Sequence, residues 1–305
     1  GAILSQVESI QPPGSGTQAN PYQISSHDHL LWMNRENDTF NENTYFVQTQ
    51  NIYPARNNDG SIANFTPIGT ANDPFVSHYD GQGYALINFK IHYNNGNQHG
   101  FFGRILDGGS VSNLSIINVS LKNTNSNGHV GALAAWLKFA KIENIYITGT
   151  VEQGSASDDF LGGLAAFVND FNDANDKTII RNIQSDIRFE SDGKKGGIVT
   201  SINTDNYPEI SQTITRNTID GVLTDPTYRA FSDLYSSNVK YYQASNFVEW
   251  SESGVYNNIN DVSEGNMYRS TADLLSLANY TDMPSFALEG YGSSNFKDKT
   301  GPWRI

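Results

Sequence analysis

Two polar segments carry the residue types that could bind a metal ion or a polar ligand. The first, Asn169–Asp176, supplies three carboxylates and three amides, and the second, Asn203–Glu209, adds two carboxylates and an aromatic ring. Carboxylate and amide oxygens are ligands that Ca²⁺ prefers, and an aromatic side chain beside them can stack on a sugar. The sequence therefore predicts a ligand-binding site made of Asp170, Asn172, Asp173, Asp176, Asp205, Tyr207 and Glu209, with Asp170, Asp173 and Asp176 as ligands of a calcium ion.

The same composition has a second interpretation, which stays open. Asn and Asp favour turn conformations and keep a protruding loop solvated, and neither segment has the spacing of an EF-hand. His27 and His29 are another candidate metal pair, but side chains two positions apart point to different faces of a helix. They favour a helix start over a metal site.

A repeat organises the chain around these segments. Its first element is an apolar box that begins with glycine, and successive boxes start 31, 31 and 34 residues apart. Recurrence at such a period is the signature of a solenoid, in which each repeat stacks on the next. The four boxes are Gly100–Leu106, Gly131–Leu137, Gly162–Val168 and Gly196–Ile202.

A second element places an asparagine inside a short apolar segment. Apolar residues lie two positions before the asparagine and one and three positions after it, which no flat strand with one buried face allows. The chain must turn a corner there, so the asparagines of successive coils should stack as a hydrogen-bonded ladder. The predicted members are Asn88, Asn113, Asn144, Asn182 and Asn217. The predicted fold is all-β: a right-handed, three-sided parallel β-helix with short helical or irregular caps at both ends.

The caps follow from the need to cover the open ends of a solenoid. We expect residues 1–36 to form the N-terminal cap, residues 37–225 the coils, and residues 226–305 a C-terminal cap or adjoining segment of the same domain. Ser25 and Ser26 before an apolar stretch predict a helix over residues 27–34, and a similar pattern predicts another over residues 270–279.

The two polar segments occupy the same corner of adjacent coils. From box to asparagine the distance is 13 residues in the first two coils and 20 or 21 in the next two. Both longer coils therefore carry insertions of about seven residues, which should lie side by side and hold the predicted ligand-binding residues. On the outer face, Glu143 and Arg181 precede the ladder asparagines and should form an ion pair between coils.

Composition removes several functional classes. The 19 Lys and Arg against 32 Asp and Glu give a net charge of −13, which repels nucleic acid and anionic lipid. Without cysteine there is no disulfide, zinc–thiolate site or cysteine nucleophile, and no apolar run is long enough for a spanning helix. We expect no nucleic-acid partner, no membrane insertion, and an extracellular or bacterial cell-surface location.

The residues also resemble a known family. Gly14–Ile24, Tyr45–Ile52 and Pro74–Tyr84 look like the first segment of bacterial β-helices with GLUG-type repeats, and the boxes and asparagine segments look like those repeats. Such modules occur in surface adhesins and in the non-catalytic N-terminal regions of immunoglobulin-A-specific metallopeptidases. The resemblance implies a binding or presentation module within a larger polypeptide, with a glycan or a host or cell-surface protein as its partner.

The main alternative is a polysaccharide lyase or glycoside hydrolase, because pectate-lyase-like enzymes share this fold. Their chemistry needs carboxylates on or beside the strand that corresponds to the glycine boxes. Neither face of the four boxes offers one, so we expect a protein that is not an enzyme. Trp136 and Phe167 should stack on consecutive coils, as a sugar platform or as a covered patch. A structural spacer without a ligand is the third alternative.

Overall fold

The computed structural model describes the chain from residue 9 to residue 269, with gaps. The described backbone covers residues 9–93, 98–123, 128–153, 160–170, 176–190, 194–204, 209–215, 218–219, 231–234, 243–250 and 266–269. Side chains are described over residues 9–92, 99–123, 128–152, 160–170, 176–190 and 196–201.

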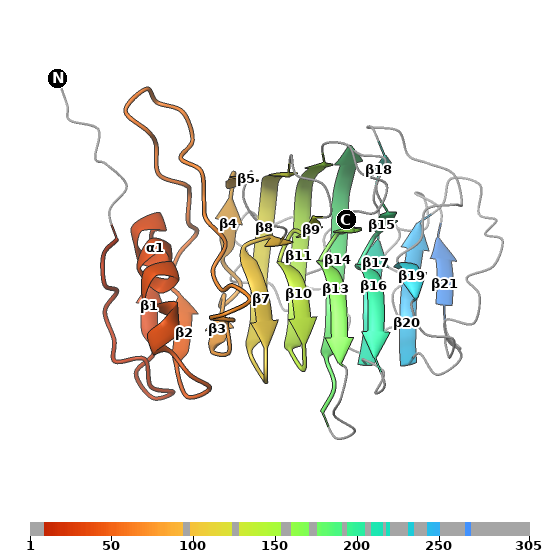
Figure 1. Ribbon diagram of the computed structural model, residues 1–305, viewed down its shortest axis with the longest axis horizontal. Helices are drawn as coiled ribbons and strands as arrows, with labels where there is room; N and C mark the ends of the chain where they lie inside the picture. The colour runs from red at the N-terminus through yellow and green to blue at the C-terminus, as the bar shows by residue number, and fades with distance from the viewer. Residues whose placement is uncertain are drawn as a thin grey trace.

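Three parallel sheets run along the molecule and form the predicted three-sided β-helix (Figure 1). The long sheet has the order β1 (Tyr22–Ile24), β2 (Tyr45–Gln48), β3 (His78–Asp80), β8 (Ser110–Asn123), β11 (Lys141–Gln153), β14 (Ile179–Glu190), β17 (Glu209–Thr215), β20 (Gln243–Trp250) and β21 (Asn266–Arg269). Beside this path, β4 (Ala85–Ile87) and β5 (Lys90–Tyr93) pair with β8, and β18 (Thr218–Ile219) pairs with β14.

The other two sheets close each coil. The box sheet contains β7 (Phe102–Leu106), β10 (Ala134–Lys138), β13 (Ala165–Asp170), β16 (Val199–Thr204) and β19 (Phe231–Leu234). The short sheet contains β6 (Gln98–His99), β9 (His129–Gly131), β12 (Phe160–Gly162) and β15 (Lys194–Gly196). One coil therefore runs from a short strand through a box strand to a long strand, as in β9, β10 and β11.

A helix covers the N-terminal end of the solenoid. The predicted helix is α1 (His27–Glu36), and a 3-10 turn, η1 (Asn37–Thr39), follows it. It begins where the sequence indicated, because Ser26 Oγ accepts a hydrogen bond from the backbone N–H of His29 at 3.2 Å. Leu30, Trp32 and Met33 are buried on its inner face. The second predicted helix, over residues 270–279, lies outside the described residues.

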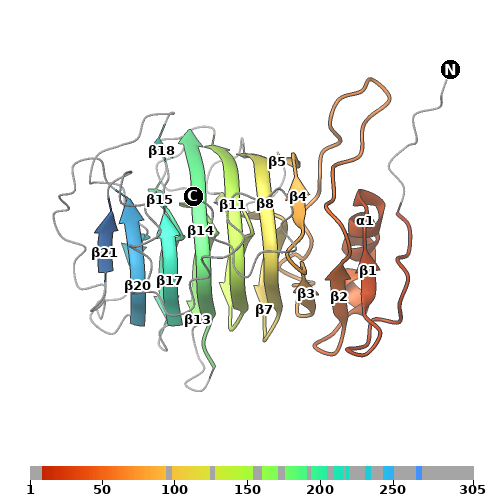
Figure 2. The ribbon, with the colours of Figure 1, turned by 180° about the vertical axis from the view of Figure 1, so that it is seen from behind.

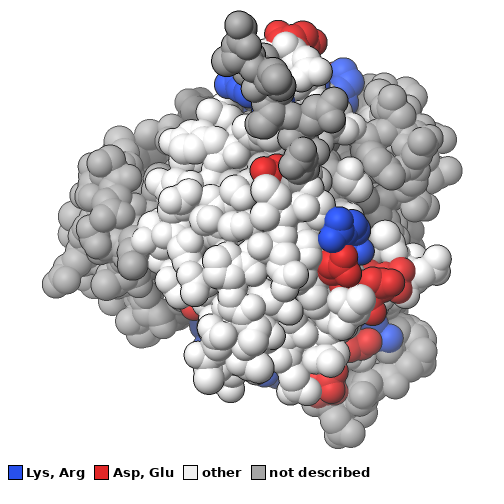
Figure 3. All heavy atoms as spheres, turned by 90° about the vertical axis from the view of Figure 1, so that its left-hand side faces the viewer, with Lys and Arg blue, Asp and Glu red and all other residues white. Residues whose placement is uncertain are grey.

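The end face around this cap carries little charge. Residues 9–26 contain no Asp, Glu, Lys or Arg, although the chain as a whole is strongly acidic. Figure 3 shows this end of the molecule, where a broad area without charged side chains is bordered by acidic and basic residues on one side.

The parallel ladder extends beyond both expected boundaries of the coils. β1 lies within residues 1–36, yet it pairs in parallel with β2. At the other end β19, β20 and β21 continue the ladder past residue 225 to Arg269. The division of the chain at residues 36 and 225 stays a prediction.

The glycine boxes differ from the expected single strands. Gly131, Gly162 and Gly196 end the strands of the short sheet, and each box strand starts three residues later. Each box thus spans the corner between two sheets. A Cβ on Gly162 would overlap the backbone carbonyl of Ala165, which explains why the corner requires glycine.

The asparagine corner is confirmed at three positions. Asn113, Asn144 and Asn182 have φ values of 55–57°, in the left-handed region that Asn tolerates. Asn144 Nδ2 donates to Asn113 Oδ1, and Asn182 Nδ2 donates to Asn144 Oδ1, each at 2.8 Å. The prediction for Asn217 is wrong: β17 pairs Ser211 with Arg181 and Thr213 with Ile183, which puts Gln212 at the ladder position beside Asn182.

The prediction for Asn88 is wrong. Asn88 accepts instead from Asn118 Nδ2 at 2.8 Å, because Leu86 lies beside Ile116 in the ladder. This second corner stack lies further along β8 than Asn113. The acceptor role expected for Asn88 belongs to Asp80, which pairs with Ser112 and whose Oδ1 accepts from Asn113 Nδ2 at 3.0 Å.

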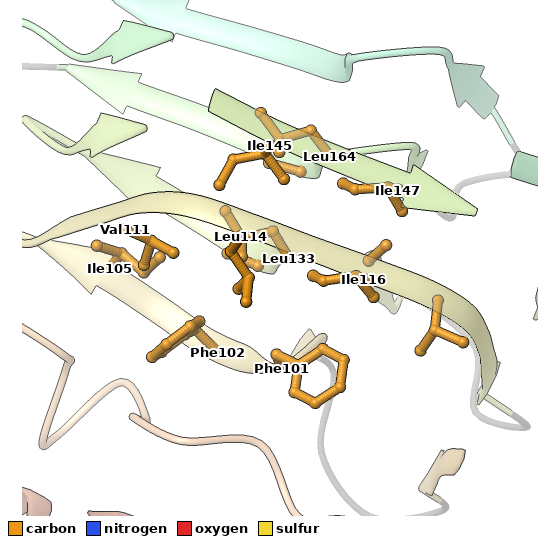
Figure 4. Packing of buried hydrophobic residues seen from close by; sticks show 14 of the residues in the cluster. Phe101, Phe102, Ile105, Val111, Leu114, Ile116, Leu133, Ile145, Ile147 and Leu164 are labelled. Carbon is orange, nitrogen blue, oxygen red and sulfur yellow. The ribbon is translucent and has the colours of Figure 1, made fainter. Parts of the chain in front are cut away.

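Apolar side chains fill the interior of the coils in layers. Figure 4 shows Leu114, Ile116, Ile145 and Ile147 pointing inward from β8 and β11, toward Leu133 on the opposite side. All five are at most 2% exposed. Burial of each such side chain stabilises the fold by about 1.5–3 kcal/mol before its entropy cost, so the stacked layers hold the coils in register.

Candidate functional site

The outer face of the box sheet carries one column of side chains, half-buried at Arg104 and Trp136 and buried at Phe167 and Ser201. Trp136 lies beside Arg104 on β7 and Phe167 on β13, and Phe167 lies beside Ser201 on β16. The neighbouring residue Leu137 pairs with Ile105 in the same ladder. Trp136 and Phe167 do stack on consecutive coils, as predicted.

A second column comes from the short sheet. Gln98, His129, Phe160 and Lys194 occupy equivalent positions of β6, β9, β12 and β15. The His129 ring lies 5.0 Å from that of Phe160, 5.9 Å from that of Trp136 and 5.8 Å from that of Phe167, measured between centroids. The two columns therefore meet outside the glycine corner. We call Arg104, His129, Trp136, Phe160 and Phe167 the aromatic corner.

Much of the aromatic corner is packed rather than open. Phe160 is 9% exposed and Phe167 is 8% exposed. The Arg104 guanidinium lies 4.4 Å from the Trp136 ring centroid in a cation–π contact, while Phe167 meets Trp136 edge-on at 4.6 Å. Burial also lowers the pKa of Arg104. The geometry favours the covered patch over a flat sugar platform.

His129 and Phe160 were missed in the sequence. Their signal was available, because each lies two residues before the first glycine of a box. The boxes were interpreted as strands that begin at glycine, which left the short strand before them unassigned.

The two insertions leave the fold from adjacent rungs. β13 and β16 pair as far as Asp170 and Thr204. The strands that precede residues 171–178 and 205–208 therefore end side by side. The strands that follow these residues also begin side by side, because Ile179 pairs with Glu209 at the start of β14 and β17. The turns at this corner in the two preceding coils are only residues 107–109 and 139–140. The second insertion, residues 205–208, is shorter than the seven extra residues expected, because that length was counted to Asn217 and the ladder position of its coil is Gln212.

Asp170 is built into this corner. Its side chain is fully buried, and its Oδ1 accepts from the Phe139 N–H at 2.9 Å and from Thr178 Oγ1 at 2.7 Å. Its Oδ2 accepts from the Thr178 N–H at 2.7 Å. Burial raises the pKa of this carboxyl, and these hydrogen bonds partly offset the effect. The carboxylate thus ties the root of the insertion to the preceding coil.

The other predicted ligand-binding residues are placed only in part. Asp176 is exposed three residues before β14 begins, and Glu209 is the first residue of β17, where the backbone alone is described. Asn172, Asp173, Asp205 and Tyr207 lie outside the described residues. The described part of the chain holds no cluster of three or more metal-ligating side chains, so the calcium site stays a prediction.

The His29 side chain bonds at the helix start, whereas the His27 side chain bonds the segment that begins at Ala55. His27 Nδ1 accepts from the Ala55 N–H at 2.7 Å, and His29 Nδ1 accepts from the Ser25 N–H at 3.1 Å. The predicted ion pair on the outer face is present, with Arg181 Nη1 3.8 Å from Glu143 Oε1. None of the helices among the described residues has the length and apolar character required to cross a bilayer.

Comparison with known proteins gives partial matches. No protein-family model matches the chain, so the GLUG-type assignment stays a prediction. A candidate Gly-rich membrane protein of Evansella cellulosilytica is 30% identical over 139 residues, which is 46% of this chain and 16% of that protein. Halomucin of Haloquadratum walsbyi is 29% identical over 159 residues, which is 51% of this chain and 2% of that protein.

One solved structure matches nearly the whole chain. It is the crystal structure of a candidate immunoglobulin A1 protease from Bacteroides ovatus, with a TM-score of 0.61 and 18% identity. The match covers 91% of this chain and 92% of that chain. At this identity the likeness shows the shared fold alone.

Proposed function

We propose that this chain is a non-catalytic binding or presentation module of a bacterial surface or secreted protein. Its partner is a glycan or a host or cell-surface protein, bound by the two insertions. The observation that carries this proposal is the pairing of Asp170 with Thr204 and of Ile179 with Glu209, which fixes both ends of both insertions on adjacent rungs. A rigid base lowers the ordering entropy that a binding loop loses when it engages a ligand.

The relatives support a module within a longer chain. The chain spans only 16% and 2% of the two sequence relatives it matches. One of these is named for a membrane protein, which agrees with a surface location for the protein that contains this module. Calcium, held by oxygens of the insertions, would neutralise carboxylates that otherwise repel an anionic partner.

A glycan array in the presence of calcium, with a chelator as the comparison, tests this function. We would compare the unchanged chain with the variant Asp173→Asn, Asp176→Asn, Asp205→Asn. The matched control is Asp38→Asn, Asp59→Asn, Asp73→Asn, which removes the same charge from exposed aspartates away from this corner. Asp170 is left unchanged because it is part of the fold.

We expect the first variant to lose at least about tenfold in binding, or about 1.4 kcal/mol, and the control to bind unchanged. Equal binding by both variants would place the contact surface outside the insertions. An unchanged thermal melt in calcium and in chelator would remove the calcium ion from the proposal and leave the insertions as direct contacts.

A polysaccharide-active enzyme is the second candidate, favoured by one observation. β19 adds a fifth rung to the box sheet and brings Asp233 beside Ser201, so the outer column reaches a carboxylate that the four boxes lack. Release of unsaturated products or reducing ends from uronate or neutral glycans, abolished by Asp233→Asn, would establish this alternative.

A further inference from the structure

A hairpin projects from the N-terminal part of the solenoid. It spans Ala55–Ala63 and appears as the orange loop that rises above the sheets in Figures 1 and 2. Arg56 and Ile62 form an antiparallel bridge, and the Ala63 N–H donates to Ala55 O at 2.9 Å. Tyr53, at its base, is 59% exposed. The hairpin is thus an ordered projection with an exposed aromatic side chain beside it.

The chain on either side of the hairpin is tied to the long sheet. The Ile52 N–H donates to Ala85 O, and Asn64 exchanges hydrogen bonds with the backbone of His92. Between these two points, residues 53–63 make one hydrogen bond to another element of the described structure. It is the bond from the Ala55 N–H to His27 Nδ1, at 2.7 Å.

The His27 side chain that accepts this bond is buried between aromatic rings. It is 3% exposed, and its ring lies 5.5 Å from that of Phe65 and 5.4 Å from that of Phe89. An amide N–H can only donate, so Nδ1 carries no proton and the ring proton is on Nε2. Nε2 is buried and has no hydrogen-bond partner within the described part of the chain. The fold leaves this donor unsatisfied and keeps the contact with Ala55.

We propose that His27 is an acid-sensitive latch that holds the hairpin against the body of the protein and releases it when the imidazole is protonated. A proton on Nδ1 would place two donors opposite each other across the present hydrogen bond, which removes the attraction. The imidazolium would also be buried between two phenyl rings with an unpaired N–H on its other side, which is costly. Release would free the segment from Tyr53 to Ala63 while the sheets remain intact.

The charge environment of His27 agrees with this behaviour. Burial lowers its pKa to about 4, and the nearby carboxylate of Asp28 offsets part of the effect. Because the pKa lies below its ordinary value of 6.5, the stability that this bond contributes is complete above pH 6.5 and is lost as the pH falls through about 4. The other titratable or charged groups on the elements packed around it are Arg56 and Asp59 on the hairpin, Lys90 and His92 on β5, and, on α1, His29 together with Arg35 and Glu36 at the far end of the helix.

A pH titration of the ¹⁵N-labelled chain by NMR tests the latch. We expect the Ala55 amide resonance to change with a midpoint near pH 4, in step with protonation of the His27 ring. The amides of Ile145 and Ile183, in the middle of the long sheet, should stay unchanged over this range. In His27→Asn, Oδ1 can take the place of Nδ1 as a non-titrating acceptor, and the transition at Ala55 should disappear.

His29→Asn is the matched control, since His29 lies on the same helix and has a pKa that burial also lowers. It should leave the Ala55 transition in place. A transition that persists in His27→Asn, or a wild-type Ala55 amide that does not respond, overturns the proposal. Simultaneous change at Ile145 also counts against it, because that pattern is global unfolding. If His27→Asn does not fold, the wild-type titration decides by whether Ala55 follows the His27 ring.

Discussion

Asn113 donates a hydrogen bond from Nδ2 to Oδ1 of Asp80 at 3.0 Å, so a carboxylate precedes the first asparagine of the corner ladder. A carboxylate can only accept, which makes Asp80 a natural end for a row of amides that all donate in the same direction. Asp80 Oδ1 also accepts from the backbone N–H of Gln82 at 2.8 Å, within its own loop. The ladder is thereby fixed to the N-terminal part of the solenoid.

Replacement of Asn144 should test how much the ladder contributes. Asn144→Ala loses two side-chain hydrogen bonds between coils and puts alanine at φ 57°, so we expect the free energy of unfolding to fall by about 2–4 kcal/mol. Asn144→Gly loses the same hydrogen bonds without the steric cost of a Cβ, so its free energy of unfolding should fall by about 1–2 kcal/mol. Urea denaturation measures both. Equal losses in the two variants would mean that the backbone conformation contributes nothing.

The glycine corner predicts a steric effect that burial alone would not. A Cβ at Gly162 would overlap the Ala165 carbonyl, so Gly162→Ala should destabilise the fold by about 3 kcal/mol, the upper end of the range for overpacking. Gly60→Ala is the comparison, because a Cβ there meets nothing within 4 Å and only its φ of 83° adds strain, about 1 kcal/mol. Thermal melts of both variants check the order of the two effects.

Removal of the Thr178 hydroxyl should make stability depend on pH through Asp170. Thr178→Val deletes a hydrogen bond that lowers the Asp170 pKa, so the pKa, already raised by burial, should rise further. The loss, about 1.5–3 kcal/mol near neutral pH, should shrink as the pH falls through the folded-state pKa and Asp170 becomes protonated. Thr178→Ser keeps the hydroxyl. In urea titrations at neutral pH and at a pH below the Asp170 pKa, it should be as stable as wild type. A loss that does not vary with pH would assign the effect to packing.

The ion pair on the outer face should contribute little. Glu143 and Arg181 are 40% and 38% exposed, and their closest N–O distance is 3.8 Å. We expect Glu143→Gln to change the free energy of unfolding by less than about 1 kcal/mol, and the change to disappear at high salt. Urea titrations at low and high ionic strength measure it, and a larger, salt-independent loss would contradict a solvent-exposed pair.

The sequence predicted the coils because their signals are local. Asn113, Asn144 and Asn182 each sit in an apolar segment whose phase changes at the asparagine, and that phase requires a corner. Asn88 has the same local pattern, but it lies in the second corner stack, next to Asn118 instead of Asn113. Its distance from Asn113 is 25 residues instead of 31, which was the available sign that it belongs to another stack.

Contacts between segments that the repeat does not relate could not be predicted from the sequence. The bond between Ala55 and His27 joins residues 28 positions apart, and no repeat relates them. Asp170 was predicted as a ligand from its residue type, whereas its burial depends on how Thr178 returns at the end of the insertion. Residue types therefore indicated where polar chemistry gathers, and only the fold separates the structural carboxylate from exposed Asp176.

The direction of the asparagine ladder also bears on the order in which the chain can fold. Every amide donates toward the coil that precedes it, so each completed coil presents an acceptor to the coil that has not yet formed. Asn182 Oδ1, the last acceptor of the described ladder, is buried and has no hydrogen-bond partner among the side chains that the structure describes. A polypeptide that emerges N-terminus first, from a ribosome or a secretion pore, would thus find a template for each new coil already in place.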